Sequence, residues 1–196
     1  MMADHPKSEV RGPKSTIGRP MASSSFDFCD SPEALGRALA ARVPRPAAIV
    51  GVGSPLRGDD GFGPAVVAAL GPCAMLRPFD VQAVPESFLV PIVESGCPGL
   101  VFVDAADLGA APGRVAVVPA ARLAEVDVST HAIALSLVAE AVGRLAEEGG
   151  RKVAAVLLAA QPADLDDADR LSGPVAQAVR LAAEGLKVFA ALPPVR

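Results

Sequence analysis

The stretch that decides the fold is AAIVGVGSPLRGDDGFGP, residues 47–64. An apolar run enters a glycine-rich loop, as happens where a buried β-strand ends and a helix follows. Gly53 and Gly58 have the four-residue gap of a phosphate-binding loop, but Asp59 and Asp60 stand where that loop carries Lys and Ser or Thr. Two carboxylates there would repel a polyphosphate. The sequence therefore predicts a strand-end loop that faces a cation, with a helix cap and a solvated acid as the ordinary alternative.

A second carboxylate stands at the end of another apolar run. The segment VFVDAADLG places Asp104 directly after the run and Asp107 three residues later. Open α/β sheets bind their ligands at the carboxyl ends of strands, so Asp104 is a candidate partner for Asp60. A turn-forming role explains Asp104 equally well.

A histidine completes the candidate set. In VDVSTHAIALSLVAEAV a helix is expected to begin at Ser129 or Thr130, with His131 in its first turn. The helix N-terminus disfavours imidazolium, and neutral imidazole is the form that binds metal. A partly buried core histidine is the alternative. Asp60, Asp104 and His131 together form an O,O,N set suited to zinc, nickel or manganese.

Nucleophile sites have less support in the sequence. A G-x-S-x-G elbow is absent from the chain. Ser129 lies too close to His131 in sequence to form a Ser-His couple at a helix start. Cys73 and Cys97 could in principle pair with His131, but both stand in proline-flanked connections without an activating feature. A cysteine hydrolase is therefore the weaker alternative.

Apolar runs alternate with helical patterns along the rest of the chain, which predicts a central sheet covered on both faces. Residues 1–29 are polar and rich in Pro, Ser and Gly, so we expect a disordered extension before a single α/β domain over 30–196, with its core from about residue 45. The predicted strands are Ala47–Val52, Asp80–Val84, Leu100–Val103, Arg114–Val118 and Val153–Ala159. One predicted helix has Asp30 or Ser31 as its N-cap. The other predicted helices are Gly63–Leu70, Phe88–Glu94, Thr130–Glu148 and Leu171–Lys187.

Composition narrows the function classes. The chain has 196 residues, 51% of them hydrophobic, and a formal net charge of −4 without Trp or Tyr, which argues against nucleic-acid binding. Three separated cysteines without a C-x-x-C pair argue against a disulfide framework or a cysteine-built zinc site. No apolar stretch reaches the ~20 residues of a membrane span, and no signal peptide is visible. We therefore expect a cytoplasmic protein without a membrane partner.

Five segments in order resemble the maturation endopeptidases of nickel–iron hydrogenases, and most closely those of the formate-hydrogenlyase branch. The resemblance covers the chain from about Ala47 to Ala183. The segments are GVGSPLRGDDGFGP, AVPES, VFVDAADLGAAPGRV, STHAIALS and LLAAQPADLD.

The resemblance implies an α/β/α fold around a mixed, mostly parallel five-stranded sheet. It also implies an endopeptidase that removes a C-terminal extension from the hydrogenase large-subunit precursor after nickel insertion. The metal-contacting and catalytic positions of the family fall on Asp60, Asp104 and His131, with Asp59 orienting the loop. The nickel is carried by the substrate, so the isolated protease is expected to be metal-free, although other divalent ions could occupy the site. Either the metal polarises the scissile carbonyl or activates water, or Asp60 acts as general base.

Two other activities are compatible with the sequence, and the chain departs from the family pattern at some positions. A non-catalytic nickel-binding or chaperone-like assembly factor would use the same three residues, and a small-molecule α/β hydrolase is a third alternative. Ser54 stands where the family has Asn, and LAAQP keeps Gln161 and Pro162 but lacks the family's glycine. Glu86 matches a family Pro-Glu pair, either near the site or as a surface acid.

Overall fold

A six-stranded sheet forms the centre of the molecule, and a computed structural model describes it over residues 26–125, 132–166 and 168–193. The strands are β1 (Asp27–Cys29), β2 (Ala47–Val52), β3 (Leu76–Gln82), β4 (Gly99–Ala105), β5 (Val115–Pro119) and β6 (Ala154–Ala160). Their order across the sheet is β1-β5-β6-β4-β2-β3. β3, β2, β4 and β6 pair in parallel, whereas β5 and β1 add antiparallel to the β6 side. The mixed, mostly parallel sheet is confirmed, but the predicted number of five strands is wrong.

The extra strand is β1, whose residues the sequence analysis placed in the extension. β1 pairs antiparallel with β5, with Phe28 opposite Ala116. Asp27 forms an ion pair with Arg42, and the Arg114 guanidinium lies 5.1 Å from the centre of the Phe28 ring. A three-residue strand is too short to show a period of its own, so these long-range contacts define it. The disorder predicted for residues 1–25 concerns a segment that lies outside the described residues.

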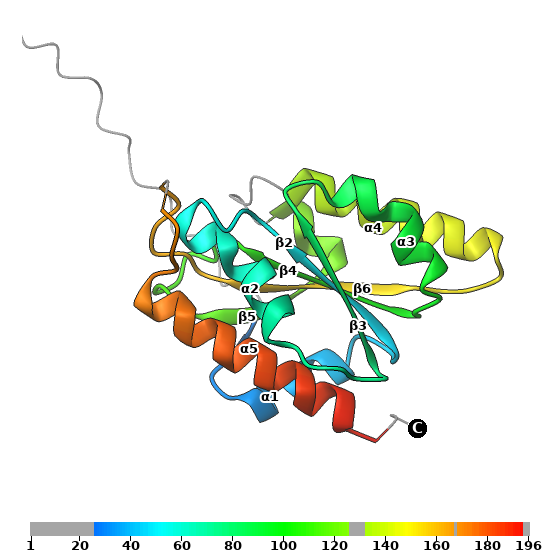
Figure 1. Ribbon diagram of the computed structural model, residues 1–196. Coiled ribbons are helices and arrows are strands. Elements are labelled where there is room, and N and C mark those ends of the chain that lie inside the picture. Colours follow the sequence, from blue (N-terminus) through cyan, green and yellow to red (C-terminus); the bar gives the residue numbers. More distant parts are fainter. Residues whose placement is uncertain (1–25, 126–131, 167, 194–196) are drawn as a thin grey trace, which may run out of the picture.

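Helices cover both faces of the sheet, which confirms the three-layer α/β/α fold (Figure 1). One layer holds α1, α2 and α5, and the other holds α3 and α4. None of the helices in the described part is long and apolar enough to cross a membrane. The helices are α1 (Pro32–Ala40), α2 (Phe62–Ala69), α3 (Leu89–Glu94), α4 (Ala132–Glu148) and α5 (Gly173–Ala191), with short 3-10 turns η1 (Gly58–Gly61), η2 (Pro85–Phe88) and η3 (Ala120–Glu125).

Strand β2 shows how the sequence separates the two cores. All six of its residues are buried. Ala47 and Ile49 pack into the core under α1, α2 and α5, while Ala48 and Val50 pack into the core under α3 and α4. Because successive strand residues point to opposite faces, a continuous apolar run is what a strand covered on both sides requires.

The start of α2 lies very close to the carboxyl ends of β2 and β4. A Cβ added at Gly63 would lie 2.2 Å from the Val52 carbonyl oxygen and 2.3 Å from that of Val103. Only glycine therefore fits at this position. This close approach brings η1, which contains both loop carboxylates, against β4.

Candidate active site

Asp60 lies in η1 at the carboxyl end of β2, where the loop folds back on itself. Its side chain is buried, with 5% of the residue exposed. Oδ2 of Asp60 accepts a hydrogen bond from the Ser54 backbone N–H at 2.8 Å. Gly53 has φ +118°, and a Cβ there would lie 1.9 Å from the Asp60 carbonyl oxygen, so the return of the loop requires glycine. The loop thus orients the carboxylate through the main chain.

Ser54 stands where the family pattern has Asn, and its contacts show what this difference changes. The Ser54 backbone holds Asp60, whereas its side-chain Oγ accepts from Leu56 N–H at 3.3 Å within the same turn. A short turn-forming side chain is therefore sufficient at this position. The serine leaves the contact with Asp60 in place.

Asp59 is fully buried and has a different set of contacts from Asp60. Its Oδ2 accepts from Ala163 N–H at 2.7 Å, from Asp164 N–H at 3.1 Å and from Ser172 Oγ at 2.9 Å. Its Oδ1 accepts from Ser172 N–H at 2.7 Å. Four hydrogen bonds satisfy the buried charge. Asp59 therefore fastens the loop to the segment before α5, the orienting role expected of it.

Main-chain hydrogen bonds join the same two segments. Gly58 N–H donates to the Ala168 carbonyl at 2.8 Å, Ala168 N–H donates to Leu56 at 3.2 Å, and Asp59 N–H donates to Asp164 at 3.0 Å. Gly58 has φ +52°. The loop that contains Asp60 and the segment before α5 therefore donate and accept each other's backbone hydrogen bonds, which joins them into one unit.

Asp104 is fully buried near the carboxyl end of β4, in register with Ala159 of β6. β4 lies next to β2 in the parallel part of the sheet, and η1 contacts β4. The structure therefore brings Asp60 and Asp104 to the same edge of the sheet, as the strand ends predict. Asp104 is part of the strand ladder and not of a turn.

His131, the third candidate, lies outside the described residues. The described part of α4 begins at Ala132, and α4 packs over the face that carries α3. Within the described ranges, no group of three or more His, Cys, Asp and Glu side chains is arranged to hold a metal ion. The three-residue metal set and the nickel it would face stay predictions. Two buried carboxylates are compatible with a hard or borderline cation.

Gln161 is a site residue whose role the sequence did not reveal. Its Oε1 accepts from Leu108 N–H at 2.7 Å and from Ala110 N–H at 3.2 Å, which holds the loop that follows Asp104. Its backbone N–H donates to the Arg114 carbonyl at 2.9 Å. An isolated Gln-Pro pair carries no signal for such a contact, since the partners are about fifty residues away in sequence.

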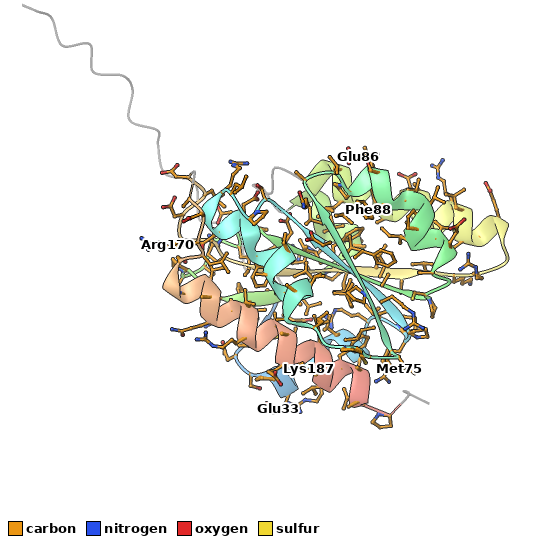
Figure 2. The ribbon with its side chains drawn as sticks, in the orientation of Figure 1. Glu33, Met75, Glu86, Phe88, Arg170 and Lys187 are labelled. Atoms are coloured by element: carbon orange, nitrogen blue, oxygen red, sulfur yellow. The ribbon has the colours of Figure 1, made fainter. Side chains whose placement is uncertain are left out.

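The remaining polar candidates lie on the surface. Asp107 is exposed, and its Oδ1 accepts from Gly109 N–H at 2.9 Å, which makes it a turn residue. Glu86 is exposed on η2, and Figure 2 shows it with Phe88 at the end of the molecule near α3 and α4.

The cysteines lie away from the two carboxylates. Cys73 precedes β3, and Cys97 precedes β4, so both stand at the amino ends of parallel strands. Asp60 and Asp104 stand at the carboxyl ends. This placement argues against either cysteine as a nucleophile at the candidate site.

Comparison with known proteins assigns the family. The model of the HycI family, described as hydrogenase maturation protease, matches residues 79–187, more than half of the chain. The chain belongs to the hydrogenase maturation protease family. This confirms the resemblance found in the sequence and makes the protein a protease. The matched range includes Asp104 and His131 and begins after Asp60.

Solved structures agree with the family assignment. The hydrogenase maturation protease HycI from Thermococcus kodakarensis is 25% identical, with a TM-score of 0.64, over 79% of this protease and 97% of that chain. The endopeptidase HycI from Escherichia coli is 22% identical, with a TM-score of 0.59, over 76% and 96%. HybD from T. kodakarensis is 21% identical, with a TM-score of 0.61, over 74% and 98%. A comparison with curated proteins gave no match.

Proposed function

We propose that this protease removes the C-terminal extension of a nickel–iron hydrogenase large-subunit precursor after nickel has been inserted. The observation that supports the proposal is the pair of buried carboxylates, Asp60 and Asp104, at the ends of two adjacent parallel strands. The family assignment supplies the reaction class. The partner is the precursor, and the nickel ion is part of the substrate.

The residues have distinct roles in this proposal. Asp60, Asp104 and His131 face the nickel of the precursor, with two carboxylate oxygens and one imidazole nitrogen as the donor set. The Ser54 N–H fixes one oxygen of Asp60, so the carboxylate is oriented before substrate arrives. Asp60 is then positioned either as a contact to the metal or as the base that takes a proton from water. A metal ion would supply Lewis acidity at the scissile carbonyl.

The test is cleavage of a purified, nickel-loaded large-subunit precursor, followed by mass spectrometry of its C-terminus. We expect the wild-type protease to shorten the nickel-loaded precursor and to leave the nickel-free precursor intact. Asp60→Asn, Asp104→Asn and His131→Ala should each lower the cleavage rate about 100-fold or more. Asp107→Asn, at an exposed turn residue of the loop after β4, is the matched control and should cleave at the wild-type rate.

Two results would contradict the proposal. If the precursor keeps its full length while the protein binds its nickel, the chain is a non-catalytic assembly factor. If the Asp60→Asn and Asp104→Asn variants cleave the precursor as fast as the Asp107→Asn variant, the catalytic site of the protease lies elsewhere on the molecule.

A further inference from the structure

A pocket of about 320 Å³ lies directly behind the loop that carries Asp60. The loop contributes Pro55, Gly58 and Gly61 to its wall, and Gly61 is the residue that follows Asp60. A Cβ added at Gly61 would lie 3.1 Å from Pro55 Cα and 3.6 Å from Leu171 Cδ2. The pocket and the candidate catalytic carboxylate therefore share one piece of backbone.

A second wall of the pocket is held in place by contacts already described. Asp169, Arg170 and Leu171 form it, just before Ser172 at the start of α5. Asp59 binds both the N–H and the Oγ of Ser172. Because these hydrogen bonds tie one wall to the other, the pocket is formed before any ligand binds, which lowers the entropic cost of binding.

The lining of the pocket is apolar, and its rim is charged. Pro55 and Leu171 line the pocket together with Pro64, Ala65 and Ala68 of α2. Two acids, Asp80 and Asp169, and one base, Arg170, also line the pocket and are exposed, so negative charge is in excess at its rim. Figure 2 shows Arg170 at the loop that leads into α5. A volume near the lower end of the range of small-ligand pockets suits an amino-acid side chain.

An extended peptide can reach this pocket along the edge of the sheet. β3 is the last strand of the sheet, so one of its edges is not paired with another strand of the described chain. Asp80, which lines the pocket, belongs to β3. Main-chain groups at such an edge bind extended peptides, with alternate side chains entering pockets. Leu56, which follows Pro55 in the same loop, is 71% exposed and adds apolar surface next to that pocket residue.

We propose that this pocket binds an apolar side chain of the precursor's C-terminal segment, next to the bond that is cleaved. The residue beside that side chain is basic or uncharged, because the rim would repel an acidic one. The inference rests on the proposed function for the identity of the peptide. It adds a substrate-binding site formed by Pro55, Ala65, Ala68 and Leu171.

The kinetic test fills the pocket with a large side chain. Ala68 is exposed on α2 and lines the pocket, while the neighbouring Ala69 is exposed and does not line it. We expect Ala68→Trp to raise the KM for the nickel-loaded precursor about tenfold, with a much smaller change in kcat, since one apolar side chain loses its binding place. Ala69→Trp should keep the wild-type KM. Equal KM values for the two variants would overturn the proposal.

A second measurement separates this proposal from the proposed function. A photo-crosslinking benzophenone amino acid replaces Ala68 or Ala69, and the probe is the same nickel-loaded precursor. We expect an adduct from position 68 only, mapped by mass spectrometry to the C-terminal segment of the precursor. That result supports the pocket even if the wild type cleaves nothing, in which case the proposed function alone fails. Adducts from neither position, or equally from both, overturn the pocket whether or not cleavage occurs.

The charge of the pocket rim allows a third test of the proposal. Replacing both rim acids, in Asp80→Lys/Asp169→Lys, should raise KM where the residue beside the bound side chain is basic and leave KM unchanged where that residue is uncharged. Arg170→Gln should lower KM slightly or leave it unchanged. The opposite pattern would show that the residue beside the bound side chain is acidic, contrary to the proposal.

Discussion

The carboxylate of Asp59 binds Ser172 through both of the serine's donors, the backbone N–H at 2.7 Å and the hydroxyl at 2.9 Å. The same hydroxyl accepts from Val175 N–H at the first turn of α5. Ser172 therefore caps a helix and at the same time connects it to the loop that contains Asp60. The candidate catalytic loop and the start of α5 are supported by one buried carboxylate.

Removing that carboxylate should weaken the whole domain. Asp59→Ala leaves three backbone N–H groups and the Ser172 hydroxyl without their acceptor, and we expect the free energy of unfolding to fall by about 3 kcal/mol or more. Urea unfolding measures the change. Asp166→Ala, at an exposed acid of the same segment, is the control and should change stability by less than about 0.5 kcal/mol. Similar midpoints for the two variants would rule out this role for Asp59.

The side-chain carbonyl of Gln161 should protect the loop after Asp104 from opening. In Gln161→Ala the amides of Leu108 and Ala110 lose their acceptor, so their hydrogen exchange should accelerate about tenfold and stability should fall by about 1–2 kcal/mol. Gln161→Glu keeps an oxygen at this position and should retain most of the protection. Unchanged exchange in the alanine variant would contradict the assignment.

The sequence predicted the parts of this fold that depend on local patterns. One such part is the apolar run of β2, because burial on both faces requires a continuous apolar strand. Another is the position of Asp60 and Asp104 at or just after the carboxyl ends of β2 and β4. The beginning of β3 was placed too late, since Leu76–Gln82 includes Pro78, which an edge strand accepts but a central strand does not. β1 was missed because three residues carry no period.

Contacts between distant segments account for the rest of the site. Asp59 binds residues more than a hundred positions away, and neither partner's local sequence indicates the other. Ser172, followed by Gly and Pro, is the N-cap of α5, whereas the predicted helix began at Leu171. The local sequence located this helix to within two residues but did not indicate its link to Asp59. Local pattern therefore located the carboxylates, and the family resemblance gave Asp59 the supporting role. The folded chain shows which distant residues Asp59 contacts in that role.

Glycine at position 63 should be indispensable. Gly63→Ala places a methyl group against two carbonyl oxygens, at 2.2 Å and 2.3 Å, and we expect a loss of at least about 3 kcal/mol in unfolding free energy or failure to fold. Gly143 in α4 has open space around its added Cβ, so Gly143→Ala should stabilise the protein by about 0.5–1 kcal/mol. Thermal unfolding compares the two. A well-folded Gly63→Ala protein would show that α2 can move away from the strand ends.

The thiol of Cys29 should make stability depend on alkaline pH. Burial raises the pKa of Cys29 above its ordinary value of 9.0, with the Asp27 and Asp30 charges adding to the rise and Arg42 opposing it. A folded-state pKa above the unfolded one means that the folded chain holds its proton longer. The stabilising contribution is therefore complete below the unfolded pKa and is lost as pH rises from about 9.0 towards the folded value.

The measurement is the free energy of unfolding at intervals between pH 7 and 10. Cys29→Ala should lose part of the alkaline decline, although its stability at pH 7 is lower because the buried side chain is smaller. Cys73→Ala, at a half-buried thiol, is the comparison and should keep the wild-type slope. An identical slope in all three proteins would assign the alkaline decline to other groups.

Strand β1 also bears on how the protein is best shortened for study. Residues 1–29 form the predicted polar extension, so a shortened protein would be designed to begin at Asp30. That truncation removes β1, the strand that pairs with β5. The exposed edge would then be Val115–Pro119, an apolar strand able to pair with the same strand of another molecule. A shortened chain that begins before Phe26 should remain monodisperse at concentrations where one beginning at Asp30 associates.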